Sequence, residues 1–223
     1  MYKTIGQNNM KKSQTVYRYL AEAALKDKNA GFAMRDMARA LHISPNTVSL
    51  AIKPLERVGA VSRRSNRAGV LDLEKLMAFW AVSRNLEKDI IYRTYVDERE
   101  TEIEKRMPSE IAFTCYSAYS MLFGNDASDY SGVYAYATEK GLEQIMKRFP
   151  EKRLSGKSGY SNLIVLKPDQ VLEEMINTGT LKRSSVSVPQ IYVDLWNNKD
   201  WYANEFLKKL KVRMDEMYAK AIL

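Results

Sequence analysis

The clearest pattern of apolar and polar positions lies between Phe32 and Leu71. Apolar residues recur at helical spacing over 34–41 and again over 45–58, where Val48, Ile52, Leu55 and Val58 form one stripe. Ser44 stands where a helix N-cap is expected, Pro45 suits the first helical position, and Gly59 suits the residue after the last turn. The pattern therefore predicts two helices joined by a tight turn.

One residue departs from this pattern. Pro54 lies inside the second predicted helix, where it removes the hydrogen bond to the carbonyl of Leu50 at a cost of about 3 kcal/mol in an isolated helix. Because the apolar stripe continues across Pro54, we predict a kink rather than the end of the helix.

A short basic hairpin is predicted next. Residues 61–63 and 70–71 favour two strands around a turn that contains Ser65, Asn66 and Gly69. Arginines at the tip of such a hairpin are suited to phosphate contacts.

The order and spacing of these elements over residues 11–72 resemble the winged helix-turn-helix family of transcription regulators. The resemblance implies binding of double-stranded DNA. Donors and acceptors on the polar face of the second helix would reach bases and phosphates, and the hairpin would contact the backbone. The predicted DNA-binding residues are Ser44, Asn46, Thr47, Ser49, Lys53, Arg57, Arg63, Arg64 and Arg67.

The rest of the chain predicts two domains. A polar arm (1–9), a helix over 10–27 and a helix after Asp72 (73–86) complete a winged-helix DNA-binding domain at 1–88. The second domain, 89–223, alternates between strands and helices. Its strands are predicted at 89–96, 132–137, 162–166 and 186–188, and its helices at 111–123, 142–149, 169–179, 189–195 and 200–221. The predicted fold class is α/β (α+β), with 162–166 a strand buried on both faces.

The charged residues are divided unevenly between the first and the second part of the chain. The net charge of +8 arises from residues 1–95, which carry 17 Lys and Arg against 8 Asp and Glu, whereas 96–223 carry 18 against 19. A basic excess confined to one domain is typical of a DNA-binding module. The chain has no apolar run long enough to span a membrane and no signal peptide, and Cys115 stands alone, so we expect a cytoplasmic protein.

The sequence gives little indication of a phosphate-binding, catalytic or metal site in the second domain. The loop 154–159 contains Gly-Lys-Ser, but Glu151 replaces the first glycine of a phosphate-binding loop and the loop precedes a strand. His42 is the only histidine and lies in the predicted helix-turn-helix, so the second domain can form neither a histidine-based triad nor a histidine zinc site. Asp126 and Asp129 are better explained by loop and capping roles than by magnesium binding. We expect no enzyme activity, no cofactor and no metal.

A second resemblance covers most of the chain. Residues 76–80, 113–123, 133–137 and above all the sequence from Val188 to Leu195 are similar to the AbiEi-type antitoxins of type IV toxin–antitoxin systems. The resemblance implies repression of the operon promoter by the first domain and a degenerate nucleotidyltransferase fold for the second. Asn125 stands after Phe123-Gly124 where an active nucleotidyltransferase has serine, and no Asp-x-Asp pair follows.

The sequence therefore predicts a DNA-binding transcriptional regulator that acts as a repressor. A homodimer is expected from the surplus of apolar residues in the last helix, and an antitoxin role would add a toxin encoded nearby as a partner. The alternative is a nucleotidyltransferase-like protein whose winged helix positions a nucleic-acid substrate. A module that binds protein through the winged helix is disfavoured by the division of charge.

Overall fold

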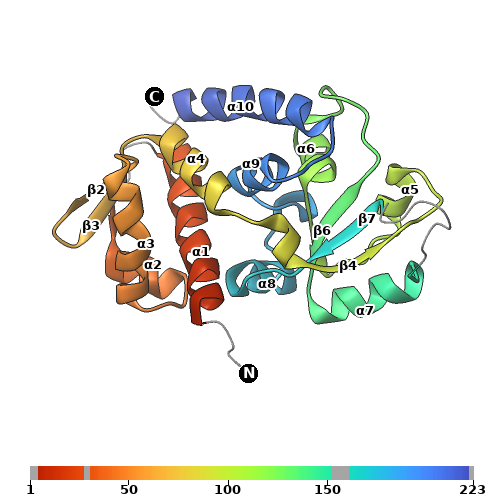
Figure 1. The fold of residues 1–223 in the computed structure, drawn as a ribbon, viewed down its shortest axis with the longest axis horizontal. Helices are drawn as coiled ribbons and strands as arrows, with labels where there is room; N and C mark the ends of the chain where they lie inside the picture. Colours follow the sequence, from red (N-terminus) through yellow and green to blue (C-terminus); the bar gives the residue numbers. More distant parts are fainter. Residues whose placement is uncertain (1–4, 28–30, 152–160, 221–223) are drawn as a thin grey trace. The chain divides into compact units, whose positions relative to one another are not determined.

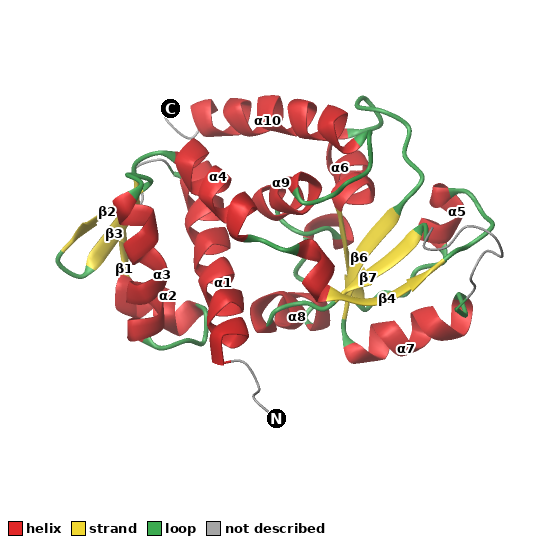
Figure 2. Cartoon of the chain, viewed as in Figure 1, coloured by secondary structure: helices red, strands yellow, loops and turns green. Residues whose placement is uncertain are grey.

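The computed structural model describes residues 5–27, 31–151 and 161–220. The fold is mixed α/β, with helices and two sheets, which confirms the predicted class at this level (Figure 2). No helix in these ranges combines the length and the apolar character needed to cross a membrane.

The chain forms two compact units. Unit 1 comprises residues 1–84 together with 211–223, and unit 2 comprises residues 85–210. The last helix, α10 (Ala203–Lys220), therefore begins in unit 2 and ends in unit 1, where Lys211 forms an ion pair with Glu74 at 2.6 Å. The predicted division at residues 88 and 89 did not include this return of the chain.

Unit 1 is built from helices around a small antiparallel sheet. Its elements are α1 (Ile5–Lys26), β1 (Gly31–Ala33), α2 (Met34–Ala40), α3 (Pro45–Arg57), β2 (Val61–Arg64), β3 (Arg67–Val70) and α4 (Leu73–Ser83) (Figure 1). The sheet order is β1-β3-β2. The short strand β1 was not predicted, and α1 begins at Ile5, inside the predicted polar arm.

The apolar stripes predicted in unit 1 form its core, except that Val58 was wrongly assigned to the stripe of α3: it follows the last turn of the helix and is 42% exposed. Val48, Ile52 and Leu55 on α3 have no exposed surface, and neither has Trp80 on α4. Asp72 caps α4 as predicted, because its carboxylate accepts a hydrogen bond from the Lys75 amide at 2.9 Å. Burial of this one apolar face leaves the opposite side of α3 in contact with solvent.

Unit 2 is organised around a mixed sheet with the order β4-β7-β6-β5. Strands β6 and β7 are parallel, and the other pairs are antiparallel. Its elements are η1 (Leu86–Asp89), β4 (Ile90–Thr94), α5 (Glu100–Lys105), β5 (Ile111–Thr114), α6 (Cys115–Phe123), β6 (Val133–Ala137), α7 (Glu139–Arg148), β7 (Leu163–Leu166), α8 (Gln170–Asn177), η2 (Lys182–Ser184), α9 (Val188–Trp196) and the first part of α10.

Two sequence predictions in unit 2 were wrong. The predicted helix 111–123 is a strand, β5, followed by a helix, α6, and the chain turns at Cys115 with a φ of 51°. The predicted strand 186–188 is reduced to an isolated bridge between Phe113 and Ser185. The prediction of a strand buried on both faces is confirmed by β7, which is fully buried between β4 and β6. The loop 154–159 lies outside the described residues.

Candidate nucleic-acid interface

The helix α3 presents one polar face because both of its ends are fixed. The Ser44 hydroxyl accepts a hydrogen bond from the Thr47 amide at 3.1 Å, and Gly59 follows the helix with a φ of 70°. The helix continues past Pro54 to Arg57, as predicted. These boundaries place the side chains between Asn46 and Arg57 on a regular helix.

The turn between α2 and α3 holds the two helices together. His42 adopts a φ of 51°, a left-handed conformation that histidine adopts more readily than most residues. The amide of Ile43 donates a hydrogen bond to the carbonyl oxygen of Ala38 at 3.0 Å, which closes the turn. As a result, α2 packs against the buried side of α3 and leaves the other side accessible.

The hairpin of β2 and β3 stands beside α3 (Figure 1). Its turn consists of Ser65 and Asn66, flanked by the paired residues Arg64 and Arg67. Gly69 was predicted to lie in the turn, but it is part of strand β3. The Asn66 carbonyl accepts a hydrogen bond from the Met34 amide at 2.8 Å, which ties the tip of the hairpin to the start of α2. The hairpin is therefore fixed at its tip.

Two side-chain contacts attach the hairpin to the rest of unit 1. The guanidinium of Arg63 donates a hydrogen bond to the Ser49 hydroxyl of α3 at 2.9 Å. The guanidinium of Arg67 donates one to the carbonyl oxygen of Gly31 in β1. The helix and the hairpin thus form one surface, and the side chains that join it, Ser49, Arg63 and Arg67, were predicted only to contact DNA.

The structure brings the nine predicted residues onto this joined surface, but they do not all have the same role. Ser44 is engaged as a cap, and Ser49 and Arg67 are engaged in contacts within the unit. Thr47 and Ser49 are half-buried. The exposed residues are Ser44, Asn46, Lys53, Arg57, Arg63, Arg64 and Arg67.

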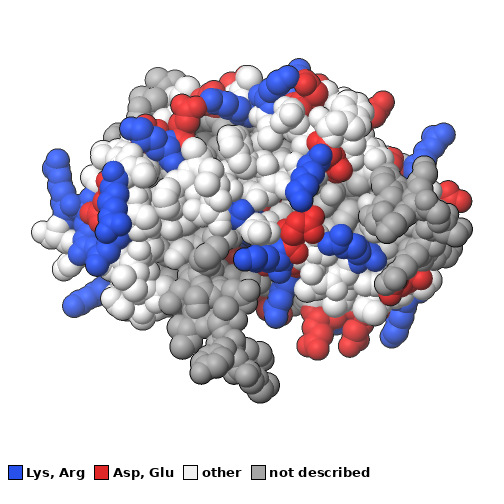
Figure 3. Space-filling model, in the orientation of Figure 1, with Lys and Arg blue, Asp and Glu red and all other residues white. Residues whose placement is uncertain are grey.

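The surface is strongly basic. Residues 31–71 carry seven Lys and Arg, and their acidic residues are Asp36 and Glu56. Blue side chains gather where Figure 1 shows α3, β2 and β3 (Figure 3). Lys53, Arg57 and Arg64 make no ion pair with any residue that the structure describes, whereas Arg39 lies 3.8 Å from Asp36. Cations that have no acidic neighbour in the fold are suited to an anionic ligand.

Sequence reasoning missed one residue of this face. Leu50 lies between Asn46 and Lys53 and is 53% exposed, although leucine is ordinarily a core residue. The signal was present, since Leu50 is out of phase with the apolar stripe of α3. Contacts to bases and phosphates are made mostly by polar and charged side chains, so the sequence pattern alone does not single out an apolar residue on this face.

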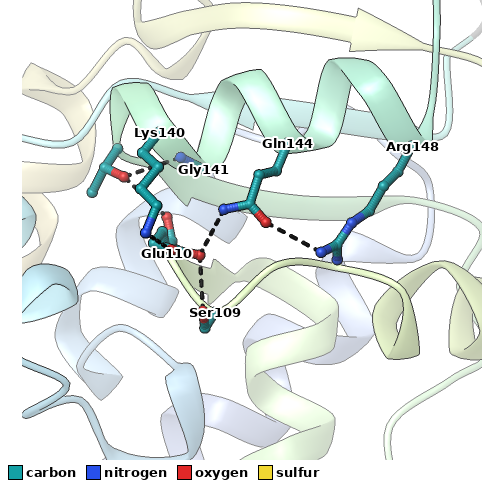
Figure 4. Close-up of polar contacts among 7 residues, drawn as sticks. Ser109, Glu110, Lys140, Gly141, Gln144 and Arg148 are labelled. Carbon is teal, nitrogen blue, oxygen red and sulfur yellow. Dashed lines mark hydrogen bonds and ion pairs between the residues drawn. The ribbon is translucent and has the colours of Figure 1, made fainter.

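A second cluster of charged residues lies in unit 2 and is internally paired. The carboxylate of Glu110 lies 2.6 Å from the Lys140 ammonium and accepts hydrogen bonds from Ser109 and Gln144 at 2.8 and 3.1 Å (Figure 4). Hydrogen bonds from Lys140, and then from Ser109, lower the pKa of Glu110 from 4.5 to about 2. Arg148 donates to Gln144 and so extends the network along α7.

One group of buried polar side chains in unit 2 is likewise internally paired. Thr114, Tyr136 and Gln190 donate hydrogen bonds of 2.7, 2.8 and 3.0 Å to the fully buried carboxylate of Asp194. These bonds link α9 to β5 and β6 and satisfy a charge that would be costly to bury alone. Over the described part of the chain, no three His, Cys, Asp or Glu side chains gather closely enough to hold a metal ion.

No family model, curated protein or solved structure matches this sequence. The geometry and the charge of the residues described above are therefore the basis for assigning a function.

Proposed function

We propose that the protein is a sequence-specific DNA-binding transcriptional regulator and that unit 1 is its winged-helix domain. The order of elements in unit 1, α1-β1-α2-α3-β2-β3, supports this proposal, because it is the order of a helix-turn-helix followed by a hairpin wing. The observation that carries the proposal is the joined basic surface of α3 and the hairpin, on which Lys53, Arg57 and Arg64 have no acidic partner among the residues that the structure describes.

The two parts of this surface suit different parts of a DNA duplex. A helix fits the major groove, where an exposed Asn46 can form paired hydrogen bonds with adenine and Lys53 can reach guanine or a phosphate. Arg63 and Arg64 lie on the hairpin, and we expect them to contact the backbone beside the groove. The Ser49–Arg63 hydrogen bond would hold the hairpin in register with α3 as both engage the duplex.

Occupation of a promoter by such a domain would repress transcription, and we propose repression as its effect. The resemblance to AbiEi-type antitoxins extends the proposal to control of an operon that also encodes a toxin. Co-expression with the neighbouring genes tests this extension. It is supported if a neighbour is toxic only when the protein is absent, and abandoned if no neighbour is toxic.

Selection of duplexes from a random-sequence pool by the full chain tests DNA recognition. We expect enrichment of one preferred sequence, with binding that weakens as salt rises because phosphate contacts release counterions. A Lys53→Ala/Arg57→Ala variant should lose affinity for every duplex, whereas a Lys140→Ala/Lys147→Ala variant of unit 2 is the matched control and should bind normally. Absence of any enriched sequence would contradict the proposal.

The predicted homodimer is tested separately. Sedimentation equilibrium of the full chain, with and without the selected duplex, should give two protein chains per DNA site if paired half-sites are used. A single chain per site would end the dimer hypothesis and leave DNA binding by a monomer.

A further inference from the structure

The exposed face of α3 is a single row of side chains. Asn46, Leu50, Lys53 and Arg57 follow one another at spacings of four, three and four residues, which places them along one line of the helix. All four are exposed. The row lies opposite Val48, Ile52 and Leu55, which are fully buried.

Leu50 is the exception in this row. Its side chain is 53% exposed, so it contributes little to the core of unit 1, and it is flanked by a carboxamide on one side and an ammonium group on the other. Another large apolar residue of unit 1, Leu71, is also exposed, but it lies after β3 and outside α3. Isolated exposed leucines are common, so it is the position of Leu50 within the row that calls for an explanation.

Ser49 is removed from the set of base-reading residues by its own contact. Its hydroxyl accepts the hydrogen bond from Arg63, so it positions the hairpin rather than a base. Thr47 is engaged as well, since its hydroxyl is hydrogen-bonded to that of Ser44 at 2.9 Å. Because a recognition helix reads bases with its N-terminal part, Arg57 in the last turn is also set apart, and Asn46, Leu50 and Lys53 remain to meet base edges.

We infer that Leu50 is a specificity-determining residue that reads the C5-methyl group of a thymine in the major groove. This inference rests on the proposed DNA-binding function. The thymine methyl is the one apolar group that the base edges of the major groove present, and apolar side chains recognise it by direct contact. Burial of Leu50 against this methyl explains why an apolar side chain is retained on a polar, basic face. The flanking Asn46 and Lys53 bring the helix into the groove where such a contact forms.

Replacement of thymine by deoxyuridine tests the contact, because it removes only the methyl group and keeps the base pair. The probe is the duplex that the full chain selects from a random pool, with each thymine replaced in turn. For the unaltered protein, we expect about fourfold weaker binding at one or two thymine positions, the effect of losing one buried methyl group.

The variants assign the effect to Leu50. Leu50→Ala should bind the thymine probe at least about fourfold more weakly and should show no further loss with deoxyuridine at those positions. Leu50→Met keeps an apolar side chain of similar length and should retain the dependence on the methyl group. Leu71→Ala is the matched control and should behave like the unaltered protein. The fold should tolerate these changes, because Leu50 is exposed and alanine and methionine are both good helix formers.

Three results would overturn the inference. Equal binding of thymine and deoxyuridine probes by the unaltered protein would show that no methyl group is read. A dependence on the methyl group that persists in Leu50→Ala, or that disappears in Leu71→Ala, would assign it to another part of the protein. Failure of the pool to yield a preferred sequence would remove the proposed function itself, which is a distinguishable outcome.

Discussion

Basic side chains occur both on the exposed face of α3 and in the network that Glu110 forms with α7, but their partners differ. In unit 2, Lys140 and Arg148 are engaged by Glu110 and Gln144 (Figure 4). In unit 1, Lys53, Arg57 and Arg64 have no such partner among the described residues. A paired charge interacts favourably within the fold. A group of like charges on one surface repels itself, which lowers stability, and it attracts a ligand of opposite charge. Lys147 on α7 also makes no ion pair with a described residue, so a single unpaired cation is not informative. The gathering of three such cations on the joined surface of α3 and the hairpin is what distinguishes the candidate interface.

The largest effect on stability is expected at the contact between α7 and the loop before β5. A Cβ at Gly141 would overlap the backbone carbonyl of Glu110, so Gly141→Ala must displace α7 and should lower the free energy of unfolding by about 1–3 kcal/mol. Urea unfolding measures this loss. Gly31→Ala is the control, because a Cβ there meets only the Arg67 side chain at 3.5 Å. If DNA affinity fell along with stability in Gly141→Ala, the contrast between the two surfaces would fail.

The largest effect on specificity is expected at Asn46. The cap of α3 is supplied by Ser44, so the Asn46 carboxamide is not needed there. Asn46→Ala should weaken binding to the selected duplex by about 1–3 kcal/mol and change binding to random DNA little. Fluorescence anisotropy with both duplexes measures the difference. Equal losses on the two would place Asn46 outside base recognition.

A smaller loss of stability is expected at the start of α3. Ser44→Ala removes the side-chain acceptor for the Thr47 amide and should cost about 1 kcal/mol in unfolding free energy. Ser44→Asn should restore the cap and most of this stability. If Ser44→Ala were as stable as the unaltered protein, the cap would make no contribution to the stability of α3.

The hairpin is expected to act mainly through charge. Arg64→Ala should weaken binding to all duplexes alike and reduce the slope of log affinity against log salt by roughly one unit, the effect of losing one phosphate contact. Lys147→Ala on α7 should leave the slope unchanged. Arg67→Ala should instead lower stability, because Arg67 holds β1 through the Gly31 carbonyl. An unchanged slope in Arg64→Ala would remove the tip of the hairpin from the interface.

The smallest effect concerns pH. Because its pKa is lowered from 4.5 to about 2, Glu110 stabilises the folded state above about pH 4.5, and this contribution is lost as the pH falls from 4.5 towards 2. Glu110→Gln should therefore show a shallower loss of stability over this range. Thermal unfolding at several pH values measures the dependence, and Glu143→Gln on α7 is the control. A pH profile identical to that of the unaltered protein would show that the Glu110–Lys140 pair contributes nothing.

Much of unit 1 could be predicted from the sequence because its signals are local. The Ser44 cap, the stripe from Val48 to Leu55 and the positive φ at Gly59 each depend on residues within a few positions of one another. The position of the hairpin after α3 follows from the same short-range pattern.

The remaining features depend on contacts between residues distant in the sequence, which the periodic pattern of apolar residues cannot predict. Strand β1 has only three residues and owes its conformation to pairing with β3, so no alternation could reveal it. The run from Ile111 to Cys115 is buried throughout, and an apolar run of this length is compatible with either a strand or a helix. The hydrogen bond between Ser49 and Arg63 joins residues 14 positions apart and follows only from the placement of the hairpin against α3.

The most direct test of the DNA interface is to follow the backbone amide signals of the full chain by NMR while the selected duplex is added. We predict that the signals that shift or broaden will be concentrated in residues 44–57 and 61–67, and that those of residues 139–148 will remain in place. Changes centred on α7, or no change along α3, would contradict the assignment of the interface to unit 1.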